Sequence, residues 1–288
     1  IDELFTDIPA EFRDPEFRIP APMSEMDLRR EMERLASRNF HAGSQPSFLG
    51  AGVYNHYSPA VIPPLVTRGE FLTSYTPYQP EVSQGTLQGT FEFQTMAAQI
   101  FGMEVSNAGM YDGASAMAEA ALMACRVTKL ARVALVSTVN PHYAEVVRAY
   151  AGPQNIEVYS IEPDATELLV DTAAVLAQNP NFFGYLEDLQ RLADMAHAAG
   201  ALFCLSADPI AAAMLKPPGA YDADIATGEG QALGVPMSFG GPYVGLFTCR
   251  KQYIRQLPGR IVGQTVDTEG RTGYVLTLQP REQHIRRE

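Results

Sequence analysis

Short hydrophobic runs alternate with amphipathic segments along most of the chain after residue 85. Continuous hydrophobic runs of five to eight residues are typical of parallel strands that are covered on both faces. The spacing of these runs along the chain leaves room for a helix between most of them. The strands that this pattern predicts are 132–138, 156–161, 173–179, 201–208, 223–228 and 243–249.

Helical periodicity occurs at 85–101, 113–127, 141–151 and 185–199. In the first of these segments the polar residues form one narrow stripe, which predicts a largely buried helix. In the last, Tyr185 is expected to share one face with the hydrophobic residues that follow it. Strands that alternate with helices predict an α/β fold, a three-layer α/β/α sandwich with a mostly parallel sheet.

The N-terminal part of the chain has a different composition, rich in proline before residue 24 and in glycine, proline and tyrosine over 43–84. Prolines favour an extended arm, and Ser24 is a suitable N-cap for a helix over 25–37. One short helix is expected near 59–67. The sequence therefore predicts an N-terminal arm and helix over 1–45 and one large domain over 46–288.

Net charge and residue usage exclude several classes of function. The formal charge of −12 disfavours nucleic acid and anionic membranes as partners. No hydrophobic run approaches the roughly 18 residues of a membrane span. The three cysteines lack CxxC spacing and are expected to be free thiols in a reducing compartment. The five histidines lack ligand spacing, so no metal site is expected.

A glycine-rich stretch, GEGQALGVPMSFGGP at 228–242, follows a predicted strand. It nearly fits a dinucleotide-binding fingerprint, but its spacing is GxGxxxG and Pro236 opposes a following helix. The stretch also has the layout of the loop that carries the cofactor lysine in pyridoxal phosphate (PLP) enzymes. It contains no lysine, and the only lysines of the chain are Lys129, Lys216 and Lys251.

Three further places carry candidate chemistry, each with an ordinary structural alternative. Gly113 and Ser115 open a predicted helix, where N–H groups hold either an anion or only a capping side chain. Asp208 ends a predicted strand, and such an acid either contacts a ligand or caps its own loop. His142 follows another strand and either stacks on a ligand ring or caps the next helix.

Long blocks of the sequence, among them NAGMYDGASAMAEA at 107–120 and the stretch at 228–242, resemble the P-protein family of the glycine cleavage system. The MYDGAS variant looks like the alpha-type subunit (subunit 1) of the two-subunit form. The resemblance extends over nearly all of the chain after about residue 45. It implies the large domain of a PLP-dependent transferase of fold type I, with the family's smaller C-terminal domain absent from this chain.

The resemblance also implies an activity. Members of the family decarboxylate glycine with PLP, whose protonated ring delocalises the electrons left by CO2, and pass the aminomethyl group to the lipoyl H-protein. The Schiff-base lysine belongs to the partner, subunit 2, and the matching position here is Gln231. The chain is then an inactive member of a cytoplasmic heterotetramer, with a vestigial cofactor pocket. That pocket would comprise Gly113, Ala114, Ser115, His142, Asp208 and Gln231.

Two other hypotheses about function remain. The chain is a scaffold that contributes nothing to an active site, or it is a self-sufficient PLP enzyme that uses Lys216 or Lys251. The loop 73–84 is relevant to the scaffold interpretation. Its prolines make it stiff, and its hydrophobic residues lack the helical or strand periodicity of a segment that fills a core. In the catalytic reading Tyr75, Tyr78 and Gln79 enter the partner's active site and orient glycine.

Overall fold

The computed structural model describes residues 2–13, 16–72 and 75–278. The chain divides into two compact units, Ile1–Phe48 and Leu49–Glu288. The described part of the first unit contains two short 3-10 helices and α1 (Glu25–Ala36), for which Ser24 is the N-cap as predicted. The Ser24 hydroxyl accepts a hydrogen bond from the Asp27 N–H at 3.2 Å, which satisfies one of the unpaired donors at the helix start.

A seven-stranded sheet forms the centre of the second unit. Strands β2 to β6 run parallel to one another, and β7 is antiparallel to β6. The order across the sheet is β1-β7-β6-β5-β4-β2-β3. The strands are β1 (Val105–Ser106), β2 (Arg132–Val136), β3 (Glu157–Ile161), β4 (Thr172–Asn179), β5 (Leu202–Ala207), β6 (Ile225–Glu229) and β7 (Gly245–Cys249).

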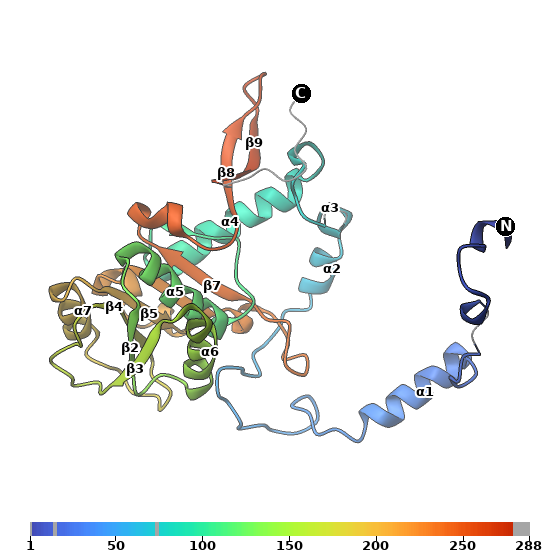
Figure 1. Ribbon diagram of the computed structural model, residues 1–288, viewed down its shortest axis with the longest axis horizontal. Helices are drawn as coiled ribbons and strands as arrows, with labels where there is room; N and C mark the ends of the chain where they lie inside the picture. The colour runs from blue at the N-terminus through green and yellow to red at the C-terminus, as the bar shows by residue number, and fades with distance from the viewer. Residues whose placement is uncertain (1, 14–15, 73–74, 279–288) are drawn as a thin grey trace. The chain divides into compact units, whose positions relative to one another are not determined.

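Helices cover both faces of this sheet, with α7 on one side of the strands and α6 on the other (Figure 1). Every residue of β5 is buried, which accounts for its continuous hydrophobic run. The buried face of α5 is rich in alanine, so the helix packs closely on the strands. The three-layer fold is therefore confirmed. Its helices are α4 (Gln84–Phe101), α5 (Gly113–Thr128), α6 (Pro141–Ala151) and α7 (Leu189–Ala198).

The predicted start of α7 was wrong. The helix begins at Leu189, where Asp188 caps it by accepting the Arg191 N–H at 3.2 Å. Tyr185 lies before this cap and is exposed. The side chain of Asn181 accepts the N–H of Tyr185 and so holds this segment in a turn, which replaces the first helical turn expected from periodicity.

The expectation that 85–101 is largely buried was also wrong, because α4 buries only one face. Leu87, Ala97 and Phe101 are buried, whereas Met96 is 54% exposed. α4 also supports an unpredicted hairpin, β8 (Ile261–Val266) with β9 (Thr272–Thr277). Buried Gln94 fixes this hairpin by bonding the N–H and the carbonyl of Val262 at 2.9 and 3.0 Å.

The remaining segments of the second unit are short. The helix expected near 59–67 is α2 (Ile62–Val66), and α3 (Gly69–Leu72) follows it. Among the described residues, no helix is long and hydrophobic enough to cross a membrane. Within the same part of the chain, no cluster of three or more His, Cys, Asp or Glu side chains is placed to hold a metal ion.

Candidate functional site

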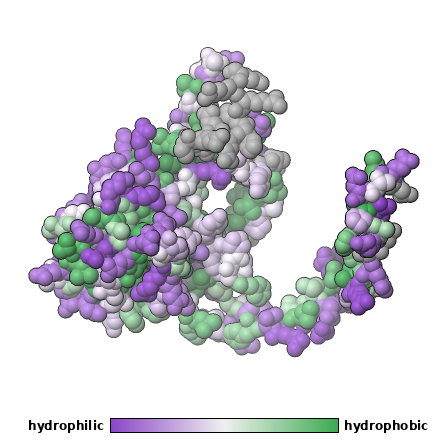
Figure 2. Space-filling view, in the orientation of Figure 1, coloured by the Kyte–Doolittle hydropathy of each residue, from purple (hydrophilic) through white to green (hydrophobic). Residues whose placement is uncertain are grey.

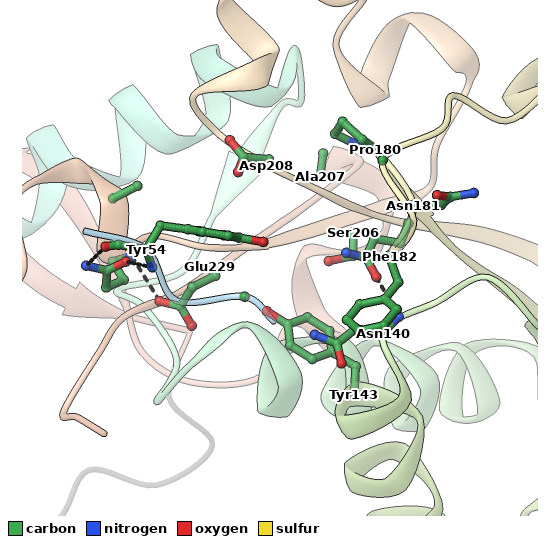
Figure 3. A pocket seen from close by; sticks show the side chains of 15 residues that line it. Tyr54, Asn140, Tyr143, Pro180, Asn181, Phe182, Ser206, Ala207, Asp208 and Glu229 are labelled. Carbon is green, nitrogen blue, oxygen red and sulfur yellow. Dashed lines mark hydrogen bonds between the residues drawn. The ribbon is translucent and has the colours of Figure 1, made fainter. Parts of the chain in front are cut away.

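A cavity of about 200 Å³ lies at the carboxyl ends of β4, β5 and β6 (Figure 3). This edge of a parallel sheet is where α/β proteins commonly bind ligands. Its described lining residues include two carboxylates but no lysine, arginine or histidine. The lining side chains that carry polar groups are Tyr54, Asn140, Tyr143, Gln178, Asn181, Ser206, Asp208, Glu229 and Gln231.

Asp208 follows β5 and lines this cavity. Its Oδ1 atom accepts hydrogen bonds from the N–H groups of Ile210 and Ala211 at 2.8 and 2.9 Å. Both sequence interpretations of Asp208 therefore have a structural basis: one oxygen caps the following turn while the side chain also borders the cavity.

The start of α5 carries the predicted capping pattern. The Asp112 side chain accepts the Ser115 N–H at 2.7 Å, and the Ser115 hydroxyl accepts the Asp112 N–H at 3.1 Å. This reciprocal capping box satisfies two of the donors at the helix start. Gly113, Ala114 and Ser115 are not among the residues that line the cavity, although their helix start adjoins it through Glu229.

Glu229 is a site residue that the sequence reasoning missed. It ends β6, and its Oε2 atom accepts the Gly113 N–H at 2.8 Å, while Oε1 accepts the Gln231 N–H at 2.9 Å. Burial raises the pKa of Glu229 above its ordinary value, and the N–H donors of Gly113 and Gln231 oppose that rise. The one available signal was its position directly after a strand and two residues before Gln231.

Gln231 is 1% exposed, and its amide is engaged on both sides. Its Oε1 accepts the Tyr54 N–H at 3.2 Å, and its Nε2 donates to the carbonyls of Tyr54 and Val235 at 3.1 and 2.7 Å. Gln231 thus binds the backbone of a segment that is distant in sequence. The Tyr54 side chain reaches into the space between Asp208 and Tyr143 (Figure 3).

Other predicted site residues lie elsewhere. His142 is exposed and does not line the cavity, whereas Asn140 caps α6 by accepting the His142 N–H at 3.0 Å. Tyr75 and Gln79 are also exposed. The Tyr78 hydroxyl accepts a hydrogen bond from Arg260 at 3.3 Å. The first two residues of the 73–84 loop are outside the described residues.

The residues present do not fit a PLP group held as a Schiff base. The structure describes all three lysines of the chain, and none of them lines the cavity. Lys129 ends α5, Lys216 lies over the Tyr221 ring, and Lys251 begins a 3-10 helix after β7. A glutamine amide at position 231 has no nucleophilic amine.

Comparisons with known proteins agree on one family. A family model described as "Glycine cleavage system P-protein" matches residues 1–288. A protein of Desulforamulus reducens named "Probable glycine dehydrogenase (decarboxylating) subunit 1" is 52% identical over all of this chain and 67% of its own length. A protein of the same name from Rhodospirillum rubrum is 51% identical over all of this chain and 66% of its own. The chain therefore spans about two thirds of these relatives.

Two solved structures are similar. A glycine decarboxylase (P-protein) of the glycine cleavage system, in inhibitor-bound form, matches with a TM-score of 0.90 and 48% identity over all of this chain and 68% of that one. A sphingosine-1-phosphate lyase from Burkholderia pseudomallei matches with a TM-score of 0.61 and 13% identity, over 93% of this chain and 67% of that one. The second likeness shows the fold alone.

Proposed function

The chain belongs to the glycine cleavage system P-protein family, and from this we propose that it is the subunit without a Schiff-base lysine in a glycine decarboxylase. Its partner is the lysine-bearing subunit 2, which binds PLP covalently. The assembled enzyme decarboxylates glycine and transfers the aminomethyl group to the lipoyl H-protein. The relatives' designation as subunit 1 supports this division between two chains.

The observation that carries this proposal is the hydrogen bonding of the Gln231 side chain. Its buried amide makes three hydrogen bonds to backbone groups, so the side chain is used in structure and not in chemistry. The absence of all three lysines from the cavity lining argues against a self-sufficient PLP enzyme. Three buried cysteines without disulfides fit a reducing compartment such as the cytoplasm.

We propose that the loop 73–84 is the part of this chain that contributes to turnover. Tyr75 is fully exposed and Gln79 is also exposed, so both side chains are available to a partner. At the partner's active site they would orient the glycine carboxylate for loss, which is an effect of positioning. The competing scaffold function predicts instead that these side chains do not affect turnover.

Borohydride reduction of the assembled enzyme, followed by peptide mass spectrometry, tests which subunit binds PLP covalently. Reduction fixes PLP to the lysine that holds it, and we expect the label on the partner subunit only. CO2 release from carboxyl-labelled glycine should require both chains. A reduced PLP adduct on Lys129, Lys216 or Lys251 would contradict the proposal.

A further inference from the structure

We propose that Glu229 is a built-in anion that occupies the phosphate position of this chain's vestigial pocket and closes the pocket to PLP, even without a covalent bond. The inference rests on the proposed function only for the identity of the excluded cofactor. Its basis is the packing of Glu229 against the start of α5, together with the segment held by Gln231.

PLP carries a phosphate dianion, and helix N-termini are common binding positions for such groups because their N–H groups point outward. At the start of α5 two of these donors are already bonded to the chain's own carboxylates. The Gly113 N–H donates to Glu229 at 2.8 Å, and the Ser115 N–H donates to Asp112 at 2.7 Å. A phosphate would have to displace at least the Glu229 carboxylate from this position.

The space beside Gly113 is also filled by the protein itself. A Cβ atom at Gly113 would lie 2.4 Å from the Tyr143 hydroxyl and 3.0 Å from the Glu229 Cβ. Contacts this short show that the start of α5 packs directly against Tyr143 and the residue that carries the carboxylate.

Charge acts in the same direction. The described residues that line the cavity include the carboxylates of Asp208 and Glu229 and no cationic side chain. A phosphate dianion would meet repulsion in a partly buried place, where solvent screens charges weakly.

Gln231 closes the other side of the pocket. Its two hydrogen bonds to the Tyr54 backbone hold that segment against the loop after β6. The Tyr54 side chain then lies within the cavity, between Asp208 and Tyr143 (Figure 3). The position of the cofactor lysine is therefore used to bind this chain's own backbone across the pocket.

The test measures anion binding by the full-length subunit in its native assembly, with inorganic phosphate and PLP as probes. Glu229→Ala vacates the position, and we expect one additional equivalent of phosphate per copy of this chain, bound at least tenfold more tightly than in wild type. Glu229→Gln removes the charge but keeps the volume, and Asp208→Ala removes a lining charge without vacating the helix start. Neither control should approach the gain of Glu229→Ala.

Equal phosphate binding by Glu229→Ala and wild type would overturn the inference. So would a gain by Asp208→Ala alone, because charge and not occupancy would then exclude the anion. If Glu229→Ala fails to fold, the PLP content of wild type decides: a second, non-covalent PLP per pair of subunits contradicts occlusion. These readouts are independent of glycine turnover, which tests the proposed function separately.

Discussion

Glu229 and Gln231 flank Gly230, and that glycine allows both side chains to turn inward. A Cβ at Gly230 would lie 2.8 Å from a Val244 methyl group and 3.0 Å from the Val244 carbonyl, so only glycine permits this approach to β7. Glu229 then faces the start of α5, and Gln231 faces Tyr54. The loop after β6 therefore joins three parts of one polypeptide.

Replacement of Gln231 tests its structural role. Gln231→Ala leaves the Tyr54 N–H and two carbonyls without their partner, and each lost hydrogen bond costs about 0.5–1.5 kcal/mol. We expect the free energy of unfolding in urea to fall by about 3 kcal/mol. The exposed Gln252 is the matched control, and Gln252→Ala should change it by less than about 0.5 kcal/mol. Equal effects of the two variants would contradict the role assigned to Gln231.

The raised pKa of Glu229 predicts a pH dependence of stability. Burial favours the protonated form in the folded chain, whereas the unfolded chain titrates near about 4.3. The stability that this group contributes is therefore full below about pH 4.3 and is lost as pH rises through the folded pKa. Relative to Glu229→Gln, wild type should lose free energy of unfolding over that interval, by at most about 1.4 kcal/mol per pH unit.

Urea unfolding of both proteins between about pH 4 and 8 measures this difference. Glu167→Gln is the control for replacement of an exposed glutamate by glutamine. A wild-type advantage over Glu229→Gln that grows with pH would show that the hydrogen bonds to Glu229 outweigh its burial.

Among the elements of the second unit, the central strands and the helices that cover them were predictable, whereas the hairpin was not. The buried run of β5 and the small residues of α5 have patterns that only the central layers produce. The β8–β9 hairpin packs on α4 and leaves its other side exposed, so its pattern is weak. The β-branched residues on either side of the Asp267–Gly270 turn were the available signal.

The residues that line the site also differ in whether the sequence predicts them. Asp208 was found because it follows a predicted strand, and strand ends converge at one edge of the sheet. Gln231 was found because the family resemblance places it where a cofactor lysine is expected. Tyr54 was not found, because its contact with Gln231 joins residues 177 positions apart and no local pattern reports it. Glu229 was missed because its role depends on the hydrogen bond from the Gly113 N–H, and Gly113 belongs to a different element.

The connection between α4 and the hairpin can be tested at the level of these elements. Gln94→Ala removes both hydrogen bonds to Val262, so the hairpin should open locally more often. We expect amide hydrogen exchange of β8 and β9 to become about tenfold faster, while β5 exchanges as in wild type. Gln88→Ala is the control, because exposed Gln88 bonds only Glu92 on the same helix. Unchanged exchange in the hairpin of Gln94→Ala would show that other contacts hold it.

At the scale of the whole molecule, the distribution of hydrophobic surface supports assembly with a partner. Hydrophobic residues lie at the surface along α2 and α3, where Leu65, Val66, Phe71 and Leu72 are 43–67% exposed (Figure 2). Exposed hydrophobic patches of this kind commonly mark protein interfaces. The loop with Tyr75 follows directly in sequence, so a partner that covers α2 and α3 would also lie near this loop.

The last prediction concerns Tyr75, the most direct test of whether this chain acts in catalysis or only as a scaffold. Pro77 and Pro80 stiffen the loop, and Gln79 has the extended backbone that a following proline favours, with φ −100° and ψ 97°. Tyr75 is 103% exposed, so Tyr75→Ala should leave the stability of the isolated chain within about 0.5 kcal/mol of wild type.

In the assembled enzyme, the same variant should lower glycine turnover by about tenfold or more while the subunits still associate, because a positioned group has been lost. Tyr75 separates the two functions better than Tyr78, whose hydroxyl already accepts a bond from Arg260 within the chain. Tyr150→Ala, on the last turn of α6, is the control for loss of a partly exposed tyrosine outside the loop. If Tyr75→Ala and Gln79→Ala both retain wild-type turnover, the loop does not act in catalysis and the chain serves its partner as a scaffold.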